Sequence, residues 1–123
     1  MAYSGWQLPK GERDRILAMI PATYPDLVAH HVTEALGDNT LPVPPEVKCE
    51  IVGWADDGKG VQALVVRING SSKRPMGGIY HITWSLDRAA GFKPVDSNKV
   101  IAENGWTPFA CLTEIKVTPK VFA

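Results

Sequence analysis

The sequence predicts an α+β fold in which antiparallel strands form the sheets and two short helices flank them. Runs that alternate apolar and polar residues recur along the chain, a turn sequence joins two of these runs, and only two segments have helical character. With 123 residues, the chain is long enough to bury one core and too short for two ordinary domains. We therefore expect a single domain over residues 1–123.

Two segments are predicted to be helices. In residues 10–20 a charged first half precedes an apolar second half, and the prolines that follow would end the helix. A shorter helix is expected at residues 97–103, with Asp96 or Ser97 as its N-cap. The start of such a helix could also receive an anion, because its first backbone N–H groups have no partner within the helix.

Five segments are predicted to be strands, namely residues 28–36, 47–55, 61–68, 79–86 and 110–117. The turn sequence of residues 56–60 lies between the second and third of these strands and predicts a hairpin. Residues 37–46 and 69–78 are rich in proline, glycine and polar side chains, which favour loops. We expect the residues after position 117 to form a tail.

A repeated tripeptide is the strongest functional signal in the chain. His31-Val32-Thr33 and His81-Ile82-Thr83 each lie in a predicted strand. Because residues i and i+2 of a strand point to the same side, each tripeptide presents an imidazole and a hydroxyl together. In the second strand the apolar residues share the other face and are expected in the core, which leaves a polar face of His81, Thr83 and Ser85.

These groups together suit cleavage of a phosphodiester bond. The reaction needs a base on the attacking oxygen, an acid on the leaving oxygen and donors on the non-bridging oxygens. His31 and His81 could supply the acid and the base, because an unperturbed histidine titrates near pH ~6.5. The hydroxyls of Thr33 and Thr83 could bind the phosphoryl oxygens, and Ser85 could extend this phosphate site. The sequence leaves open which histidine is the acid, because that depends on the side taken by the leaving group.

Other residues near the tripeptides are candidates for supporting roles. Arg74 precedes the second tripeptide, and its guanidinium could bind a phosphate in a bidentate manner. Tyr24 and Trp54 neighbour predicted turns and are the candidates for stacking on a nucleobase. We expect His30 to be structural, since its side chain would point away from that of His31, although it could still orient a neighbour.

Composition excludes several classes of function. The chain has 13 basic and 13 acidic side chains, so it lacks the positive field of a protein that binds duplex DNA, and any contact with nucleic acid must be local. The histidines and carboxylates do not cluster, and no metalloprotease, P-loop or nucleophile-elbow motif occurs. We therefore expect neither a metal nor another cofactor.

The cysteines and the absence of apolar stretches bear on the compartment. Cys49 and Cys111 lie far apart without a metal-type spacing, and we expect both to be free, buried thiols in a reducing compartment. The sequence shows no targeting segment and no run approaching the ~20 apolar residues that span a bilayer. A cytoplasmic protein with no membrane contact is expected.

With its two tripeptides the chain resembles the two-histidine (2H) phosphoesterase superfamily, whose members carry two H-x-[ST] tripeptides on facing strands. The stretches HHVTEALG (30–37), IVGWADDGKGVQALVV (51–66) and YHITWSLDRAAGFKPVDSN (80–98) are similar to its compact RNA-repair-like (Swiss-army-knife) branch. The resemblance covers most of residues 24–106. It implies pseudo-symmetric antiparallel sheets around a central cleft, with flanking helices and with His31 and His81 as the catalytic pair.

The expected function is metal-independent cleavage of a phosphodiester in an RNA end or a small nucleotide, either a 2′,3′-cyclic phosphate or a 2′-5′ or 3′-5′ linkage. The balanced charge favours a compact substrate over a long RNA. One alternative is hydrolysis of cyclic oligonucleotide defence messengers, as in some phage members of the resembled superfamily. A binding module for a nucleotide or an RNA end without turnover, and a purely structural β-domain, are the others. The sequence does not indicate an oligomeric state.

Overall fold

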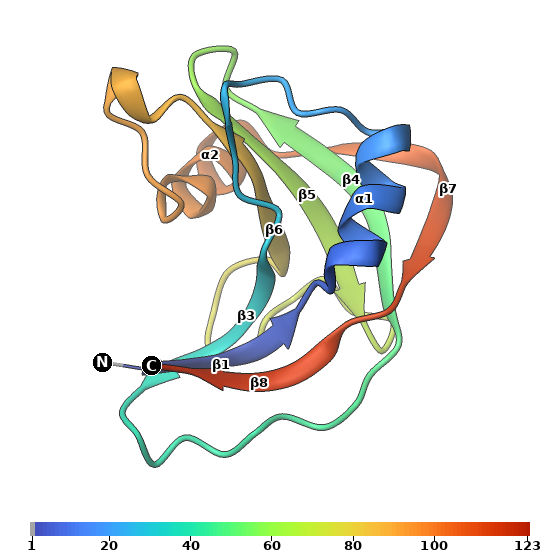
Figure 1. Cartoon of the computed structure of the whole chain (residues 1–123), viewed down its shortest axis with the longest axis vertical. Helices are drawn as coiled ribbons and strands as arrows, with labels where there is room; N and C mark the ends of the chain where they lie inside the picture. Colours follow the sequence, from blue (N-terminus) through green and yellow to red (C-terminus); the bar gives the residue numbers. More distant parts are fainter. Residues whose placement is uncertain (1) are drawn as a thin grey trace.

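The computed structural model describes residues 2–123 and has an α+β architecture of two antiparallel sheets and two α-helices (Figure 1). The five-stranded sheet has the order β2-β6-β5-β4-β7, with bounds β2 Asp26–Leu27, β6 His81–Leu86, β5 Val61–Ile68, β4 Cys49–Asp56 and β7 Thr107–Ile115. The three-stranded sheet has the order β3-β1-β8, with bounds β3 His31–Gly37, β1 Ala2–Gln7 and β8 Thr118–Phe122. The helices are α1 (Lys10–Met19) and α2 (Asp96–Asn104), and a short 3-10 helix, η1, spans Arg88–Ala90.

Most of the predicted elements are confirmed with shifted ends, and β1, β2 and β8 are additions. The predicted helices are α1 and α2, and the predicted hairpin is formed by β4 and β5. The prediction of a tail after position 117 is wrong, because these residues form β8, which pairs with β1. Pro119 has no N–H to donate, and β8 accommodates it because β8 is an edge strand.

The strand predicted for residues 28–36 is divided between the two sheets at Ala29. The N–H groups of Val28 and Ala29 still donate to the carbonyls of Trp84 and Thr83 in β6, both at 2.9 Å. Ala29 has a φ of 43°, in the left-handed region that costs a non-glycine residue about 1 kcal/mol or more. Beyond it the chain leaves β6 and pairs with β1 as β3. This turn leaves β3 in contact with β6 across the junction of the two sheets.

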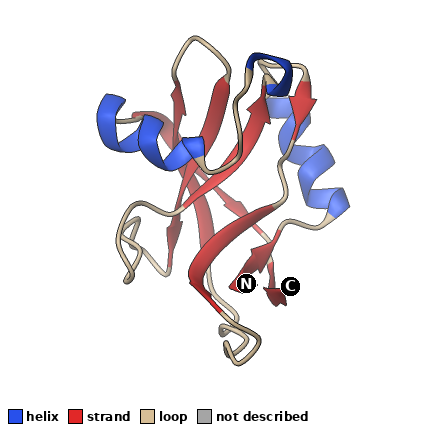
Figure 2. Ribbon diagram, turned by 90° about the vertical axis from the view of Figure 1, so that its left-hand side faces the viewer, coloured by secondary structure: helices blue, strands red, loops and turns tan. Residues whose placement is uncertain are grey.

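Two apolar clusters fill the two faces of the five-stranded sheet. The larger cluster includes the fully buried side chains of Trp6, Ile16, Val32, Leu64 and Trp84, so α1 and the three-stranded sheet cover this face. On the opposite face Val100 and Ile101 of α2 pack against the apolar side chains of β5. The two helices accordingly lie on opposite sides of the sheet (Figure 2).

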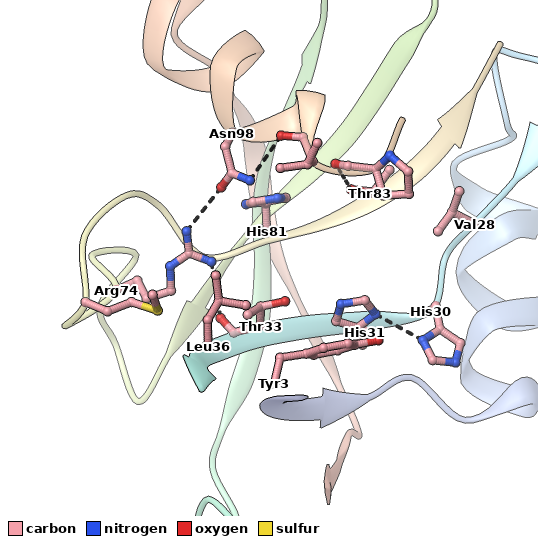
Figure 3. A pocket seen from close by; sticks show the side chains of 13 residues that line it. Tyr3, Val28, His30, His31, Thr33, Leu36, Arg74, His81, Thr83 and Asn98 are labelled. Atoms are coloured by element: carbon pink, nitrogen blue, oxygen red, sulfur yellow. Dashed lines mark hydrogen bonds between the residues drawn. The ribbon is translucent and has the colours of Figure 1, made fainter. Parts of the chain in front are cut away.

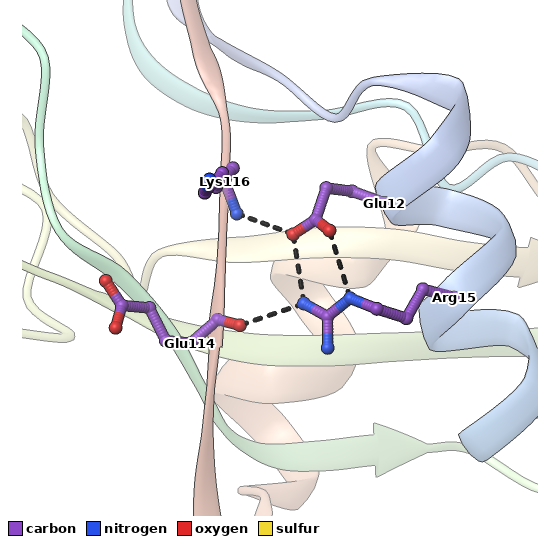
Figure 4. Close-up of polar contacts among 4 residues, drawn as sticks. All are labelled: Glu12, Arg15, Glu114 and Lys116. Atoms are coloured by element: carbon purple, nitrogen blue, oxygen red, sulfur yellow. Dashed lines mark hydrogen bonds and ion pairs between the residues drawn. The ribbon is translucent and has the colours of Figure 1, made fainter.

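A polar cluster ties α1 to the end of β7 and to the residue that follows it (Figure 4). The Arg15 guanidinium donates two hydrogen bonds of 3.0 Å to the Glu12 carboxylate and a third, also 3.0 Å, to the Glu114 carbonyl. The backbone N–H of Lys116 donates to Glu12 at 2.7 Å. The hydrogen bonds from Arg15 and Lys116 hold the pKa of Glu12 below its usual value. These contacts fix the point at which the chain passes from one sheet to the other.

The two cysteines differ in exposure. Both are free, and Cys49 is buried as expected, but the expectation of a buried Cys111 is wrong. Cys111 lies in the edge strand β7, most of which is exposed. No helix within residues 2–123 is long and apolar enough to cross a membrane.

Candidate active site

A pocket of about 400 Å³ lies at the junction of the two sheets (Figure 3). Both tripeptides line it, with His31 and Thr33 from β3 and His81 and Thr83 from β6. Among the other lining residues are Arg74 from the loop before β6, Asn98 from the start of α2 and Tyr3 from the first strand. Two tripeptides from different sheets are thus brought to one site.

Strand alternation explains why both tripeptides face the pocket. Val32 and Ile82, the central residues of the tripeptides, are fully buried in the larger core cluster. Since neighbouring side chains of a strand point to opposite faces, the flanking histidines and threonines lie on the other side. The larger core therefore lies behind the tripeptides, and the pocket lies in front of them.

The tautomer of His81 is fixed by its surroundings. Its Nδ1 lies 2.8 Å from the carbonyl oxygen of Ile79. Because a carbonyl oxygen only accepts, Nδ1 carries a hydrogen, and Nε2 has a free lone pair when the ring is neutral. Burial lowers the pKa of His81, the hydrogen bond to Ile79 opposes this shift, and the positive charge of Arg74 adds to it. A neutral His81 is therefore suited to accept a proton at neutral pH.

His31 lies in an aromatic environment at the floor of the pocket. The centroid of its ring is 4.9 Å from that of Tyr3 and 5.2 Å from that of Phe122. Burial lowers the pKa of His31 to about 4, with smaller contributions from His30 and His81. Like His81, His31 is neutral at neutral pH, so neither ring is by itself a ready acid.

His30 does not point away from His31, which corrects the sequence-based expectation. Its Nδ1 lies 3.0 Å from Nδ1 of His31, and both rings line the pocket. The expectation assumed one continuous strand, whereas β3 begins at His31 and the chain turns at Ala29. Strand alternation therefore does not apply to His30, and the two adjacent side chains can meet.

The two threonines lie in different environments. Thr33 is half-buried and lines the pocket. The Thr83 hydroxyl donates to the carbonyl of Pro94 at 3.1 Å and lies 2.8 Å from Oγ of Ser97, which can donate to it. Thr83 therefore anchors the start of α2 to β6, and its proton would have to leave Pro94 to reach a bound phosphate.

The N-cap predicted for the second helix is wrong. The N-cap residue is Val95, which makes no side-chain capping hydrogen bond. Asp96 lies in the first turn and accepts from the N–H of Lys93 at 2.8 Å. Ser97 lies within α2 and is fully buried against Thr83. The contact with β6 decides the position of Ser97, and the sequence gives no sign of this long-range partner.

Arg74 supplies a cationic group at one end of the pocket. Its guanidinium donates to the carbonyl of Gly77 at 2.9 Å, to Oδ1 of Asn98 at 3.1 Å and, weakly, to the carbonyl of Thr33 at 3.5 Å. All three acceptors are neutral, and none of the ion pairs found within residues 2–123 includes Arg74. Its positive charge is thus available to an anion in the pocket.

Three candidate residues lie away from the pocket. A bulge in the pairing of β5 with β6 shifts the alternation beyond Thr83, and the buried Ser85 hydroxyl donates to Oε1 of Gln62 at 2.5 Å. Tyr24 donates its hydroxyl to the carboxylate of Asp56. Trp54 lies opposite Leu64, on the sheet face that carries the larger core cluster. These three residues do not line the pocket.

The pocket also contains residues for which the sequence carries little signal. Tyr3 belongs to β1, which the sequence does not predict, and Asn98 lies within the predicted second helix, where nothing in the sequence marks it as a pocket residue. Exposed or half-buried apolar side chains form much of the remaining lining, namely Val28, Leu36, Met76 and Val95. Across the described residues 2–123, no group of three His, Cys, Asp or Glu side chains is placed to hold a metal ion.

Comparisons with known proteins give no family assignment. No protein-family model, curated protein or solved structure matches the chain. A functional proposal therefore depends on the chemistry of the pocket.

Proposed function

We propose that this chain is a metal-independent phosphodiesterase that cleaves an RNA end or a small nucleotide with two histidines as acid and base. The observation that carries the proposal is the meeting of His31-Val32-Thr33 and His81-Ile82-Thr83 around one pocket beside the guanidinium of Arg74. The two tripeptides come from different sheets, which supports a 2H-like, pseudo-symmetric arrangement with one tripeptide in each half. We also propose a cytoplasmic location, in which such substrates occur.

The residues have distinct roles in the proposed reaction. The phosphate binds near Arg74, whose charge and fork geometry suit its non-bridging oxygens, with the Thr33 hydroxyl as a further donor. His81, with a free lone pair on Nε2, takes the proton of the attacking oxygen. His31, on the other side of the pocket, protonates the leaving oxygen. For a 2′,3′-cyclic phosphate, the attacking oxygen belongs to water and the leaving oxygen to the ribose.

The lining of the pocket favours a substrate with one phosphate and one apolar group. Among the described residues 2–123, Arg74 is the one lining side chain with a permanent positive charge, so a second phosphate would lack such a partner there. The apolar side chains of Leu36, Met76 and Val95 suit the face of a ribose and a base. A 2′,3′-cyclic phosphate at a nucleotide or an RNA end fits this lining better than a cyclic oligonucleotide messenger.

A binding module without turnover is the second candidate, and the protonation of the histidines favours it. Burial lowers the pKa of both His31 and His81, so neither carries the acid proton at neutral pH. Two neutral imidazoles, a guanidinium and a threonine hydroxyl are sufficient to bind a nucleotide. The enzyme therefore needs a further source of the acid proton, and the binding module does not.

Hydrolysis of a substrate panel in excess chelator separates these candidates. The panel contains 2′,3′-cyclic mononucleotides, 2′-5′ and 3′-5′ dinucleotides and cyclic oligonucleotides, and the products are resolved by chromatography. We expect turnover of a 2′,3′-cyclic phosphate that is lost when His31 and His81 are both replaced by asparagine. Turnover of cyclic oligonucleotides alone would favour the messenger hydrolase, and tight nucleotide binding without any turnover would favour the binding module.

A further inference from the structure

The contact between His30 and His31 requires a proton between two nitrogens. Their Nδ1 atoms lie 3.0 Å apart (Figure 3), so one Nδ1 donates and the other accepts. If His31 donates, its Nε2 has a free lone pair. If His30 donates, a neutral His31 must carry its hydrogen on Nε2. A charged His30 carries hydrogen on both ring nitrogens and can only donate, so its protonation holds a neutral His31 with its hydrogen on Nε2.

The two rings differ in their access to water. His30 is exposed, so a charged imidazolium at this position stays hydrated. His31 is enclosed by Tyr3 of β1 and Phe122 of β8 and is only partly accessible. A positive charge on the pair is consequently best carried by His30.

We propose that His30 is a positioning residue that holds the acid proton of the site and delivers it through His31. This inference rests on the proposed phosphodiesterase function, and it names the acid that the two buried histidines lack. Charged His30 donates from Nδ1 to Nδ1 of His31, which holds His31 in the neutral form with a hydrogen on Nε2. It follows that His31 acts on the acid side of the reaction and that His81 is the base.

The proton transfer balances within the pair. As the bond from phosphorus to the leaving oxygen breaks, the Nε2 proton of His31 moves to that oxygen. The Nδ1 proton of His30 moves to Nδ1 of His31, so the pair loses one positive charge. His81 gains the proton of the attacking oxygen and becomes charged. Release of that proton from His81, uptake of a proton from water by Nε2 of His31 and return of the Nδ1 proton of His31 to Nδ1 of His30 restore the starting state.

Within the part of the chain that the structure describes, few other charged or titratable groups face the histidine pair. Tyr3 contacts His31 from β1, and burial raises the pKa of its phenol, so it stays neutral. Lys120 of β8 lies 5.4 Å from the ring centroid of Phe122, the ring that also contacts both histidines. His81, which lies on β6 across the pocket, contributes electrostatically to the lowered pKa of His31. Lys120 is therefore the neighbour to be controlled for.

Nitrogen NMR of a chain labelled with ¹⁵N in its histidines tests the coupling without any substrate. The chain has three histidines, so the imidazole spectrum is simple to assign by single substitutions. In the wild type, we expect the hydrogen of neutral His31 to shift from Nδ1 to Nε2 when His30 becomes charged. His30→Ala should abolish this shift, and His30→Asn, which can donate without titrating, should hold His31 with its hydrogen on Nε2. Lys120→Gln, a matched loss of nearby charge, should leave the shift in place.

Kinetics on the substrate found in the panel provide the second readout. We expect His30→Ala to lower kcat by about 10²-fold, within the range of a lost proton donor, with little change in KM. The alkaline limb of the pH profile, which reports loss of the acid proton, should also disappear in His30→Asn. An active enzyme whose His31 shows the same tautomer in the wild type and in His30→Ala at every pH would overturn the role of His30 alone. A wild-type chain that cleaves nothing would overturn the proposed function, whatever the NMR shows.

Discussion

The folded chain should lose stability in mild acid because His31 is held neutral. In the unfolded chain an imidazole takes up a proton near pH ~6.5, whereas in the folded chain burial lowers the pKa of His31 to about 4. Between these values the unfolded state binds more protons, so stability is present at higher pH and falls as the pH falls. At about pH 5 linkage gives a loss of about 2 kcal/mol, and water in the open pocket reduces the value that we expect to about 1 kcal/mol.

Urea unfolding of the wild type and His31→Asn measures this loss. The difference between the two free energies of unfolding, taken at about pH 7.5 and again at about pH 5, cancels the contributions of groups that both chains share. We expect the difference to change by about 1 kcal/mol in favour of the variant at the lower pH. A difference that stays constant between the two pH values would show that His31 is not held neutral by burial.

Three further substitutions test the pocket and its scaffold. Arg74→Lys keeps the charge but loses the fork, so steady-state kinetics should show a KM raised roughly tenfold with a smaller change in kcat, and an unchanged KM would remove Arg74 from phosphate binding. Gly5→Ala would place a Cβ 2.0 Å from the carbonyl oxygen of Val32, and urea unfolding should reveal a loss of about 2 to 4 kcal/mol; wild-type stability would contradict the close approach of β1 and β3. Ser85→Ala removes a buried hydroxyl that is bonded to Gln62. Urea unfolding should show a free energy of unfolding lowered by about 1 to 2 kcal/mol, with kcat unchanged. A loss of turnover at full stability would show that Ser85 acts in the site.

Local alternation was sufficient to predict the strands that carry the core and the second tripeptide. β5 has the predicted bounds, and the alternation around Ile82 places His81 and Thr83 on the face opposite the core. These features depend on neighbours in the sequence, which a pattern can show. The sequence also predicts Arg74 beside the second tripeptide, because the loop that contains it leads directly into β6.

The features that the sequence did not predict depend on contacts between distant segments. β1 is short, and its partners β3 and β8 lie far along the chain. The bulge that turns Ser85 away from the pocket arises from the pairing of β6 with β5. The approach of His30 to His31 follows from the left-handed turn at Ala29, where the chain changes sheets. Alternation within one strand contains no information on any of these.

The central claim is that His31 and His81 cleave a phosphodiester together. The most direct test is the rate of hydrolysis of a 2′,3′-cyclic mononucleotide, in excess chelator, by the wild type, His31→Asn, His81→Asn and the double variant, with Ser85→Ala as the control for an altered buried hydroxyl. We expect each single substitution to lower kcat by about 10² to 10⁴-fold while the chain stays folded. Full turnover by the folded double variant would contradict the claim.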